Sequence, residues 1–324
     1  MPNCQKCSAA PAVVRHQFTS ELLCSTCFTN QFEQEVHDHI QKYNLIPKGS
    51  EVVIGVSGGK DSSVLLTVLH TIVNQYPDIY QNVILRMCAV DEGIAGYRKE
   101  SLDVVYELQK QFGLELKVVA FKDRFERSLD ELMTTLHKDP EDVSLACSYC
   151  GLLRRNCLSH GAQLFSKEAL IATGHNADDQ AETVLLNLIR GDYQKLKRSG
   201  DQIVDLGVGN PKIKPMSYQS QKQIVLYAHH KKVKYFSTEC PYAVGAQRGV
   251  ARRYIQGAST KDKRVVLKIQ DSITDLKRGE GRGPEMNICV ECGAALVGSV
   301  CQCCQIKQAE NEIQLRKVLK TKKV

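Results

Sequence analysis

The sequence has no run of about 20 apolar residues, the length that a membrane-spanning helix needs. Its first residues also contain no apolar region of the kind found in secretory signals. We therefore expect a cytoplasmic protein with no membrane partner. Disulfide frameworks belong mainly to secreted proteins, so the fourteen cysteines of a chain without a secretion signal are expected to be reduced. They favour metal binding or sulfur chemistry.

The 324 residues are 43% hydrophobic, enough for one large domain or two with a buried core. The formal net charge of +7 is compatible with a polyanionic partner such as RNA but does not require one.

Eight of the cysteines form two modules, each made of two Cys-x-x-Cys pairs. Such pairs can close on one zinc ion with four thiolates, as in structural zinc ribbons. We expect an N-terminal ribbon over 1–32 and a C-terminal ribbon with a basic tail over 285–324. His16 is expected to be a solvated loop residue, and Cys303 a spare or alternative ligand. The ligand sets are Cys4, Cys7, Cys24 and Cys27, and Cys289, Cys292, Cys301 and Cys304.

The segment Glu51–Ser62 (EVVIGVSGGKDS) combines a β-branched run with a glycine turn and the start of a helical pattern. Such a turn presents free backbone N–H groups and the positive end of the helix dipole to an anion. Lys60 adds a charge, and Ser57 and Ser62 add hydroxyl donors. The common P-loop pattern is absent because Ile54 stands where its first glycine would be. The alternative is an ordinary strand–helix turn.

Strand-like and helix-like segments alternate through residues 33–276. Further strands are expected at Asn82–Asp91, Leu114–Phe121 and Leu170–Gly174, with a helix over Gly96–Phe112. This alternation predicts an α/β fold with a doubly wound parallel sheet. Ligands of such sheets bind at the carboxyl ends of the strands. One nucleotide could therefore touch Ser57, Ala89, Asp91 and Gly174.

A second chemical centre is expected around Cys147, Cys150 and Cys240, which lack a matching fourth cysteine. Three cysteines can hold a 4Fe–4S cluster with one open iron, two can act as a redox or persulfide pair, and a third zinc site is also possible. Cys88 and Cys157 lie in apolar patterns and are expected in the core.

Three polar stretches have open interpretations. Asp178, Asp179 and Glu182 either cap a helix, or one aspartate holds Mg²⁺ or positions a base. Gly191–Pro215 is polar and glycine-rich, as in a mobile insertion. Arg248, Arg252 and Arg253 favour a solvated helix face over an RNA-contacting one.

Taken together, SGGKDS, the three central cysteines and TGHNADDQAETVLLN resemble the tRNA 2-thiolation enzymes of the pyrophosphate-loop (N-type ATP pyrophosphatase) superfamily. The resemblance implies that ATP adenylates C2 of a wobble uridine and that sulfur displaces AMP to leave 2-thiouridine. It also implies Mg²⁺, a 4Fe–4S cluster on the three cysteines, a second thiouridylase subunit and a ubiquitin-like sulfur carrier. Rival hypotheses are a pyrophosphate-loop ligase or amidotransferase, and a non-enzymatic zinc-ribbon RNA-binding protein.

The site residues expected from the pattern and the resemblance fall into two groups. Those expected to act in catalysis are Lys60, Asp61, Asp178, Cys147 and Cys240. Those expected to bind the nucleotide and its metal are Val56, Ser57, Gly58, Gly59, Lys60, Ser62, Ala89, Asp91, Gly174 and Asp179.

Overall fold

The computed structural model describes residues 2–136, 140–205, 207, 209–243, 248–276, 286–297, 299–311, 313–315 and 318. The basic linker at 277–284 and most of the basic tail at 316–323 lie outside the described residues. Among the helices of the described part, none is long and apolar enough to cross a membrane.

A six-stranded sheet forms the centre of the molecule, in the order β5-β4-β3-β6-β8-β7. Its first five strands in this order are parallel, and β7 pairs antiparallel at the edge. The strands are β3 (Glu51–Gly55), β4 (Ile84–Asp91), β5 (Leu116–Ala120), β6 (Leu170–Ala172), β7 (Ile203–Val204) and β8 (Lys212–Ile213). β3 lies in the middle, so the turn that follows it opens at the centre of the sheet.

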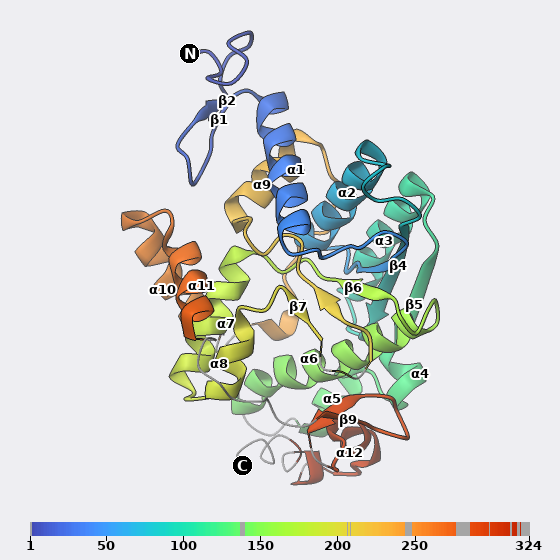
Figure 1. The fold of residues 1–324 in the computed structure, drawn as a ribbon. Coiled ribbons are helices and arrows are strands. Elements are labelled where there is room, and N and C mark those ends of the chain that lie inside the picture. Colours follow the sequence, from blue (N-terminus) through green and yellow to red (C-terminus); the bar gives the residue numbers. More distant parts are fainter. Residues whose placement is uncertain are drawn as a thin grey trace.

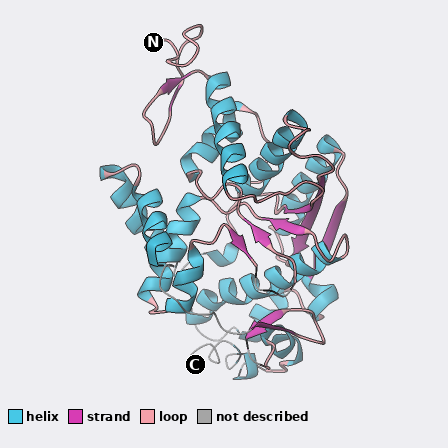
Figure 2. Cartoon of the chain, in the orientation of Figure 1, coloured by secondary structure: helices cyan, strands magenta, loops and turns pink. Residues whose placement is uncertain are grey.

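Helices cover both faces of this sheet (Figures 1 and 2). Side chains alternate along a strand: Val52 and Ile54 of β3 pack into one core, and Val53 packs into the other. The first face carries α1 (Ser25–Lys42), α2 (Lys60–Gln75), α3 (Arg98–Phe112) and α9 (Gln221–His230). The second carries α4 (Phe121–Phe125), α5 (Leu129–Leu136), α6 (Pro140–Gln163) and α12 (Gln302–Gln308).

A smaller helical layer packs beside the sheet. It comprises α7 (Ala177–Ile189), α8 (Tyr193–Ser199), α10 (Arg248–Lys261) and α11 (Val265–Leu276). The expectation of a mobile insertion at Gly191–Pro215 was wrong in its described part, because this stretch supplies α8, β7 and the parallel strand β8. Strands of two residues are too short to give a periodic sequence signal.

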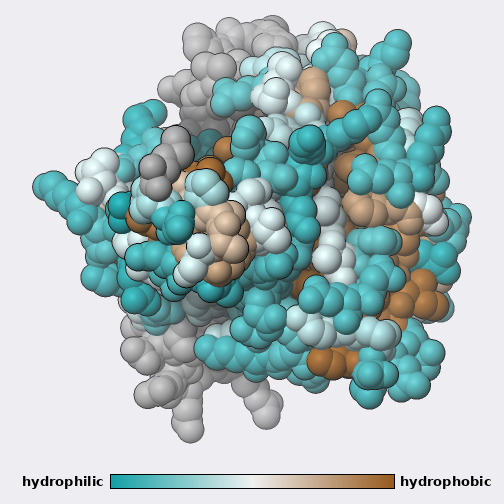
Figure 3. Space-filling view, turned by 90° about the horizontal axis from the view of Figure 1, so that it is seen from above, coloured by the Kyte–Doolittle hydropathy of each residue, from teal (hydrophilic) through white to brown (hydrophobic). Residues whose placement is uncertain are grey.

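The two cysteine modules lie at opposite ends of the molecule (Figure 1). The N-terminal module contains the hairpin β1 (Val14–Arg15) and β2 (Leu22–Leu23), and the C-terminal module contains β9 (Met286–Ile288) and β10 (Ala295–Val297). Seen from the N-terminal side, the surface is mainly hydrophilic with separate small apolar areas (Figure 3).

The N-terminal module is continuous with α1, which begins at Ser25 and spans the expected boundary at residue 32. The Cys24 side chain accepts a hydrogen bond from the Cys27 N–H, so the second cysteine pair forms the first turn of the helix. The expectation of a solvated His16 was wrong: His16 is 2% exposed. Its Nε2 lies 3.2 Å from Glu35 Oε1 and 2.6 Å from Gln223 Nε2. His16 thus joins the hairpin to α1 and α9.

We expect His39 of α1 to make the fold sensitive to acid. Burial lowers the pKa of His39 to about 4, against about 6.5 in an unfolded chain. Between these values the unfolded chain binds a proton that the folded chain does not, so stability falls as pH decreases. From pH 7 to pH 5 this group should remove about 2 kcal/mol of unfolding free energy. Urea unfolding at the two pH values measures this change. The loss of unfolding free energy from pH 7 to pH 5 should be smaller in His39→Gln than in wild type. The control His229→Gln, at an exposed histidine, should show the full loss.

Candidate active site

The turn after β3 forms a cradle of backbone N–H groups at the centre of the sheet. α2 begins at Lys60, and its N-cap Gly59 makes no side-chain cap hydrogen bond. The first-turn N–H groups are therefore left for a ligand. Ser62 Oγ donates to the Gly59 carbonyl (3.0 Å) and accepts from Ser57 N–H (3.1 Å), which holds the turn closed. The predicted strand, glycine turn and helix start are present, and the Ser62 hydroxyl donates its proton within the turn; anion binding stays a prediction.

Gly58 occupies a position that only glycine fits. Its φ is +81°, and an added Cβ would lie 2.2 Å from the carbonyl oxygen of Ser101 in α3. Arg98 secures the same contact, since its Nη1 donates to the Ser57 carbonyl (3.1 Å) and to Ser101 Oγ (3.0 Å). The phosphate loop is therefore pressed directly against α3.

We predict that Gly58→Ala weakens ATP binding at least about tenfold, because the loop must move off α3 to admit the methyl group. Gly96→Ala is the matched control: Gly96 also has a positive φ (+69°), but an added Cβ would meet nothing within 4 Å. Titration calorimetry with ATP measures both variants. Equal affinities for the two would show that the Ser101 contact does not shape the loop.

Carboxylates from α2 and α7 gather beside the cradle. The carboxyl end of β6 touches this turn, since a Cβ on Gly174 would lie 3.0 Å from the Asp61 carbonyl carbon. Asn176 Nδ2 donates to Asp61 Oδ1 (3.1 Å). Burial raises the pKa of Asp61 and of Asp178, and the nearby Asp179 raises both further. Desolvated, mutually repelling carboxylates of this kind favour a bound cation.

Asp178 and Asp179 also have structural roles. Asp178 Oδ2 accepts from the Gln221 N–H at the start of α9 (2.8 Å). Asp179 completes a capping box with Asn176 on α7. The helix-capping interpretation is therefore confirmed for Asp179, whose Oδ1 also pairs with Arg248 (3.4 Å), and the metal-binding interpretation stays a prediction.

The remaining expected nucleotide contacts lie around the end of β4. The Asp91 carboxylate accepts from Gly93 N–H (2.9 Å) at the end of this strand. Val56 and Ala89 are each 1% exposed and belong to the core below the cradle. Asp91 thus shapes the turn after β4, and the side chains of Val56 and Ala89 form the floor.

The three central cysteines come from α6 and from the segment before the 3-10 turn Pro241–Ala243. Cys147 is exposed and its thiol donates to the Tyr242 carbonyl (3.5 Å), which brings α6 beside the half-buried Cys240. Cys150 is buried and accepts from Arg154 Nη2 (3.2 Å). Cys88 and Cys157 lie in the core, as expected, and burial raises the pKa of each to about 12.

Three residues join the phosphate loop to these cysteines: Arg154, which stands beside them in the sequence, and Glu92 and Arg98, which the sequence analysis missed. Glu92, just after β4, has its Oε1 2.9 Å from Arg154 Nε and its Oε2 3.3 Å from Arg98 Nε. Arg98 holds the Ser57 carbonyl and Arg154 holds Cys150. We call Arg98, Glu92 and Arg154 the Glu92 bridge. An acid directly after a predicted strand was the available signal for it.

The basic helix α10 is only partly the solvated face that its sequence favours. Arg252 Nε lies 2.8 Å from Glu182 Oε1, and Arg248 lies near Glu182 and Asp179. Glu182 is 2% exposed, and burial raises its pKa although Arg252 opposes this. These pairs attach α10 to α7, while Tyr254 remains 66% exposed.

Comparison with known proteins gives a consistent assignment. The PP-loop domain model matches residues 28–257. The chain is 37% identical to cytoplasmic tRNA 2-thiolation protein 1 of Dictyostelium discoideum, over 94% of this chain and 82% of that protein. The protein of the same name from Saccharomyces cerevisiae (strain ATCC 204508 / S288c) is also 37% identical, over 94% and 85%. This chain belongs to the cytoplasmic tRNA 2-thiolation protein 1 family.

A solved structure supports this family assignment. The U34-tRNA thiolase NcsA from Methanococcus maripaludis, determined with its 4Fe–4S cluster, superposes with a TM-score of 0.79. It shares 27% sequence identity, over 96% of this chain and 97% of that one. The predicted doubly wound α/β fold with two terminal four-cysteine modules is confirmed.

In this family member, the terminal cysteine sets have the dimensions of single-metal sites. Within each set the four Sγ atoms all lie within 4.8 Å of one another. Cys7 and Cys24 are 3.9 Å apart, and Cys289 and Cys304 are 3.5 Å apart. Four thiolates around zinc, with bonds of about 2.3 Å, would be about 3.8 Å apart. Cys147, Cys150 and Cys240 do not form so tight a set within the described residues.

We predict two zinc ions per chain, measured by inductively coupled plasma mass spectrometry. Cys7→Ser should leave one, because three thiolates and a hydroxyl bind zinc far more weakly. Cys303→Ser is the control and should retain two, since Cys303 lies outside the four-cysteine set. Loss of zinc in Cys303→Ser would show that Cys303 is a ligand.

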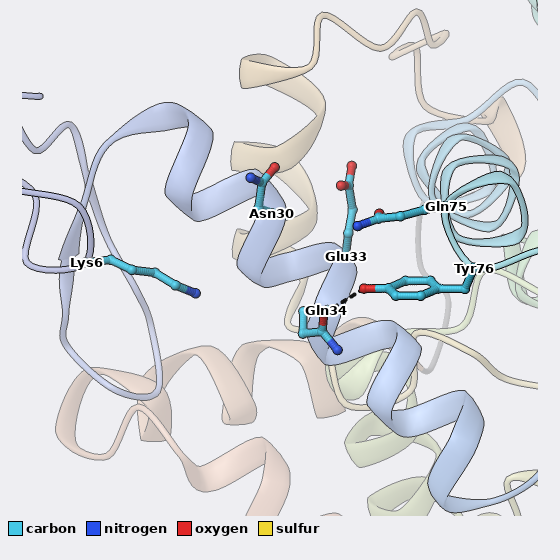
Figure 4. A pocket seen from close by; sticks show the side chains of 6 residues that line it. All are labelled: Lys6, Asn30, Glu33, Gln34, Gln75 and Tyr76. Carbon is cyan, nitrogen blue, oxygen red and sulfur yellow. Dashed lines mark hydrogen bonds between the residues drawn. The ribbon is translucent and has the colours of Figure 1, made fainter. Parts of the chain in front are cut away.

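A polar hollow of about 220 Å³ lies between the N-terminal module, α1 and α2 (Figure 4). Its wall includes Glu33 and Gln34 of α1 and Tyr76 at the end of α2, whose hydroxyl donates to Gln34 Oε1 (2.8 Å). α2 spans 16 residues, so this end lies about 22 Å from the phosphate loop at the other. The hollow is therefore separate from the nucleotide site.

Proposed function

We propose that this protein is a tRNA 2-thiolation enzyme that adenylates C2 of the wobble uridine and then replaces the oxygen with sulfur. One observation carries the proposal: the Glu92 bridge joins the phosphate loop to Cys150, one of the three central cysteines. A ligase or amidotransferase acting elsewhere would need the loop but not the cysteines.

ATP would bind with its phosphates on the loop from Ser57 to Ser62. Its adenosine would extend past Asp91 and Gly174, above the floor formed by Val56 and Ala89. Lys60 Nζ lies 3.8 Å from Asp61 Oδ1, so the ammonium stays next to the loop, where phosphate charge would collect. Asp61 and Asp178, with Asp179, would hold Mg²⁺ on the triphosphate, which would relieve their mutual repulsion.

Activation needs little covalent work from the protein. The O2 atom of the uridine attacks the α-phosphate, and the bond to pyrophosphate breaks. The loop N–H groups and Lys60 stabilise the charge that develops on the phosphate oxygens. A sulfur nucleophile brought to the cysteines then forms a bond to C2, and AMP leaves with the original oxygen.

Cys147, Cys150 and Cys240 fit a 4Fe–4S cluster. They offer three thiols without a fourth, with spacing wider than one zinc ion requires, and an arginine beside the buried thiol. Such a cluster would supply one iron without a protein ligand, where an external sulfur atom can be held. Arg154 would orient Cys150 and offset thiolate charge.

The zinc ions would be structural, one in each terminal module. We further propose a cytoplasmic location and tRNA as substrate, both supported by the relatives' names. A second thiouridylase subunit and a ubiquitin-like carrier with a C-terminal thiocarboxylate would be the protein partners.

Two assays test this function together. ATP–pyrophosphate exchange with and without tRNA reports activation, and exchange that depends on tRNA would support adenylation of the base. Mass spectrometry of tRNA nucleosides from cells that lack the protein reports the product. Unchanged wobble 2-thiouridine in those cells would refute the proposed function.

A further inference from the structure

Glu92 contacts two arginines that each reach a different part of the site. Its side chain is 4% exposed, and Arg98 is 5% exposed. Arg98 continues to the Ser57 carbonyl of the phosphate loop, whereas Arg154 continues to the Cys150 thiol. The path from the loop to the cysteines therefore passes through one carboxylate.

The charges of this bridge do not balance. One carboxylate faces two guanidinium groups, so the bridge carries a net positive charge between two places where anions would gather. Glu92 and Arg98 are desolvated at a cost, whereas the Arg154 side chain is 49% exposed, and a single arginine would satisfy a purely structural pair. Arg98 Nη2 and Arg98 Nε make no hydrogen bond with the described residues. The directional contacts of Arg98 are therefore those of Nη1 to Ser57 and Ser101, and Glu92 holds the rest of the guanidinium by charge.

We propose that Glu92 is a positioning residue that couples the ATP site to the cysteine centre by dividing its carboxylate between Arg98 and Arg154. The inference rests on the proposed function. Arg154 contacts Cys150 through Nη2 and Glu92 through Nε at the same time. When charge on the sulfur pulls Arg154 away from Glu92, the carboxylate is left to Arg98 and draws it away from the Ser57 carbonyl, which alters the phosphate loop. The coupling is reciprocal, so bound ATP changes the hold of Arg154 on Cys150.

A double-mutant cycle on ATP affinity tests the bridge, using the full-length reduced protein without tRNA and titration calorimetry. Arg154→Met, on the cysteine side, should weaken ATP binding about tenfold. Glu92→Gln should weaken it by a similar factor. The double variant should bind ATP no more weakly than Glu92→Gln alone, because Arg154 acts on the loop only through Glu92.

Arg155→Met is the matched control, since it removes the same charge from the next residue of α6, outside the bridge. The double variant with Arg155→Met and Glu92→Gln should lose ATP affinity by the product of the two single factors, as independent residues do. If the losses of ATP affinity in Arg154→Met and Glu92→Gln also multiply in the double variant, Arg154 acts only through the long-range electrostatic effect of its charge, and the inference is overturned. A wild-type protein that does not bind ATP would instead refute the proposed function.

Thermal unfolding checks that each variant folds. Glu92→Asp replaces Glu92→Gln in the cycle if the latter does not fold. It keeps the charge but is one methylene too short to reach both arginines, so the same loss of coupling is expected. Full coupling in Glu92→Asp would contradict the bridge.

Discussion

Lys60→Ala should lower ATP–pyrophosphate exchange by about 100- to 1000-fold while leaving the fold intact. The reason is electrostatic: Lys60 is the cation at the first position of α2, directly beside the phosphate loop. Removing one preorganised donor from a site of developing charge typically costs a factor of this size. Exchange of labelled pyrophosphate into ATP measures the loss directly.

The control for this prediction is Lys110→Ala, which removes the same charge from the last turn of α3, about 18 Å along that helix from Arg98. It should keep exchange within about twofold, because a solvated charge at that distance is largely screened. Thermal unfolding midpoints should be similar for both variants and the wild type. Normal exchange in Lys60→Ala would contradict the nucleotide assignment.

Cys147→Ala should separate the two halves of the reaction. Sulfur transfer should fall by at least about 100-fold, as expected when a reacting or ligating group is removed. Exchange should stay within about twofold of wild type, because Cys147 makes no contact with the phosphate loop among the described residues. Nucleoside mass spectrometry and the exchange assay measure the two activities in the same preparation.

Two further observations make the Cys147→Ala result specific. Cys147 is exposed, so the change should leave unfolding unaltered, whereas Cys157→Ala removes a buried thiol and should retain sulfur transfer. Anaerobically purified wild type should show broad iron–sulfur absorption that Cys147→Ala lacks. A colourless, fully active anaerobic protein would favour persulfide chemistry at the cysteines instead.

The sequence predicts the parts of the site that lie at strand ends. Apolar strand-length runs followed by glycine or acid mark Ser57, Asp91 and Gly174, and parallel topology alone brings strand ends together. The Glu92 bridge could not be predicted in this way. Arg154 is far from Glu92 and Arg98 along the chain, and only packing of α6 against β4 brings it to them.

His16 and Arg252 show a second limit of sequence patterns. Both are polar residues in segments that look solvated, and both pair with an acid on another element. Their partners, Glu35 and Glu182, belong to helices whose polar positions also look exposed. Burial of such pairs depends on tertiary contacts that local periodicity does not report.

The contacts of His16 also bear on local unfolding of the N-terminal module. The hairpin around His16 shares Glu35 and Gln223 with the body of the protein, and the α9 cap near Gln223 supports Asp178 through Gln221 N–H. A continuous chain of contacts therefore links the N-terminal module to the carboxylates beside the phosphate loop. We expect local opening of this module to disturb Asp178 while the core of the sheet stays folded.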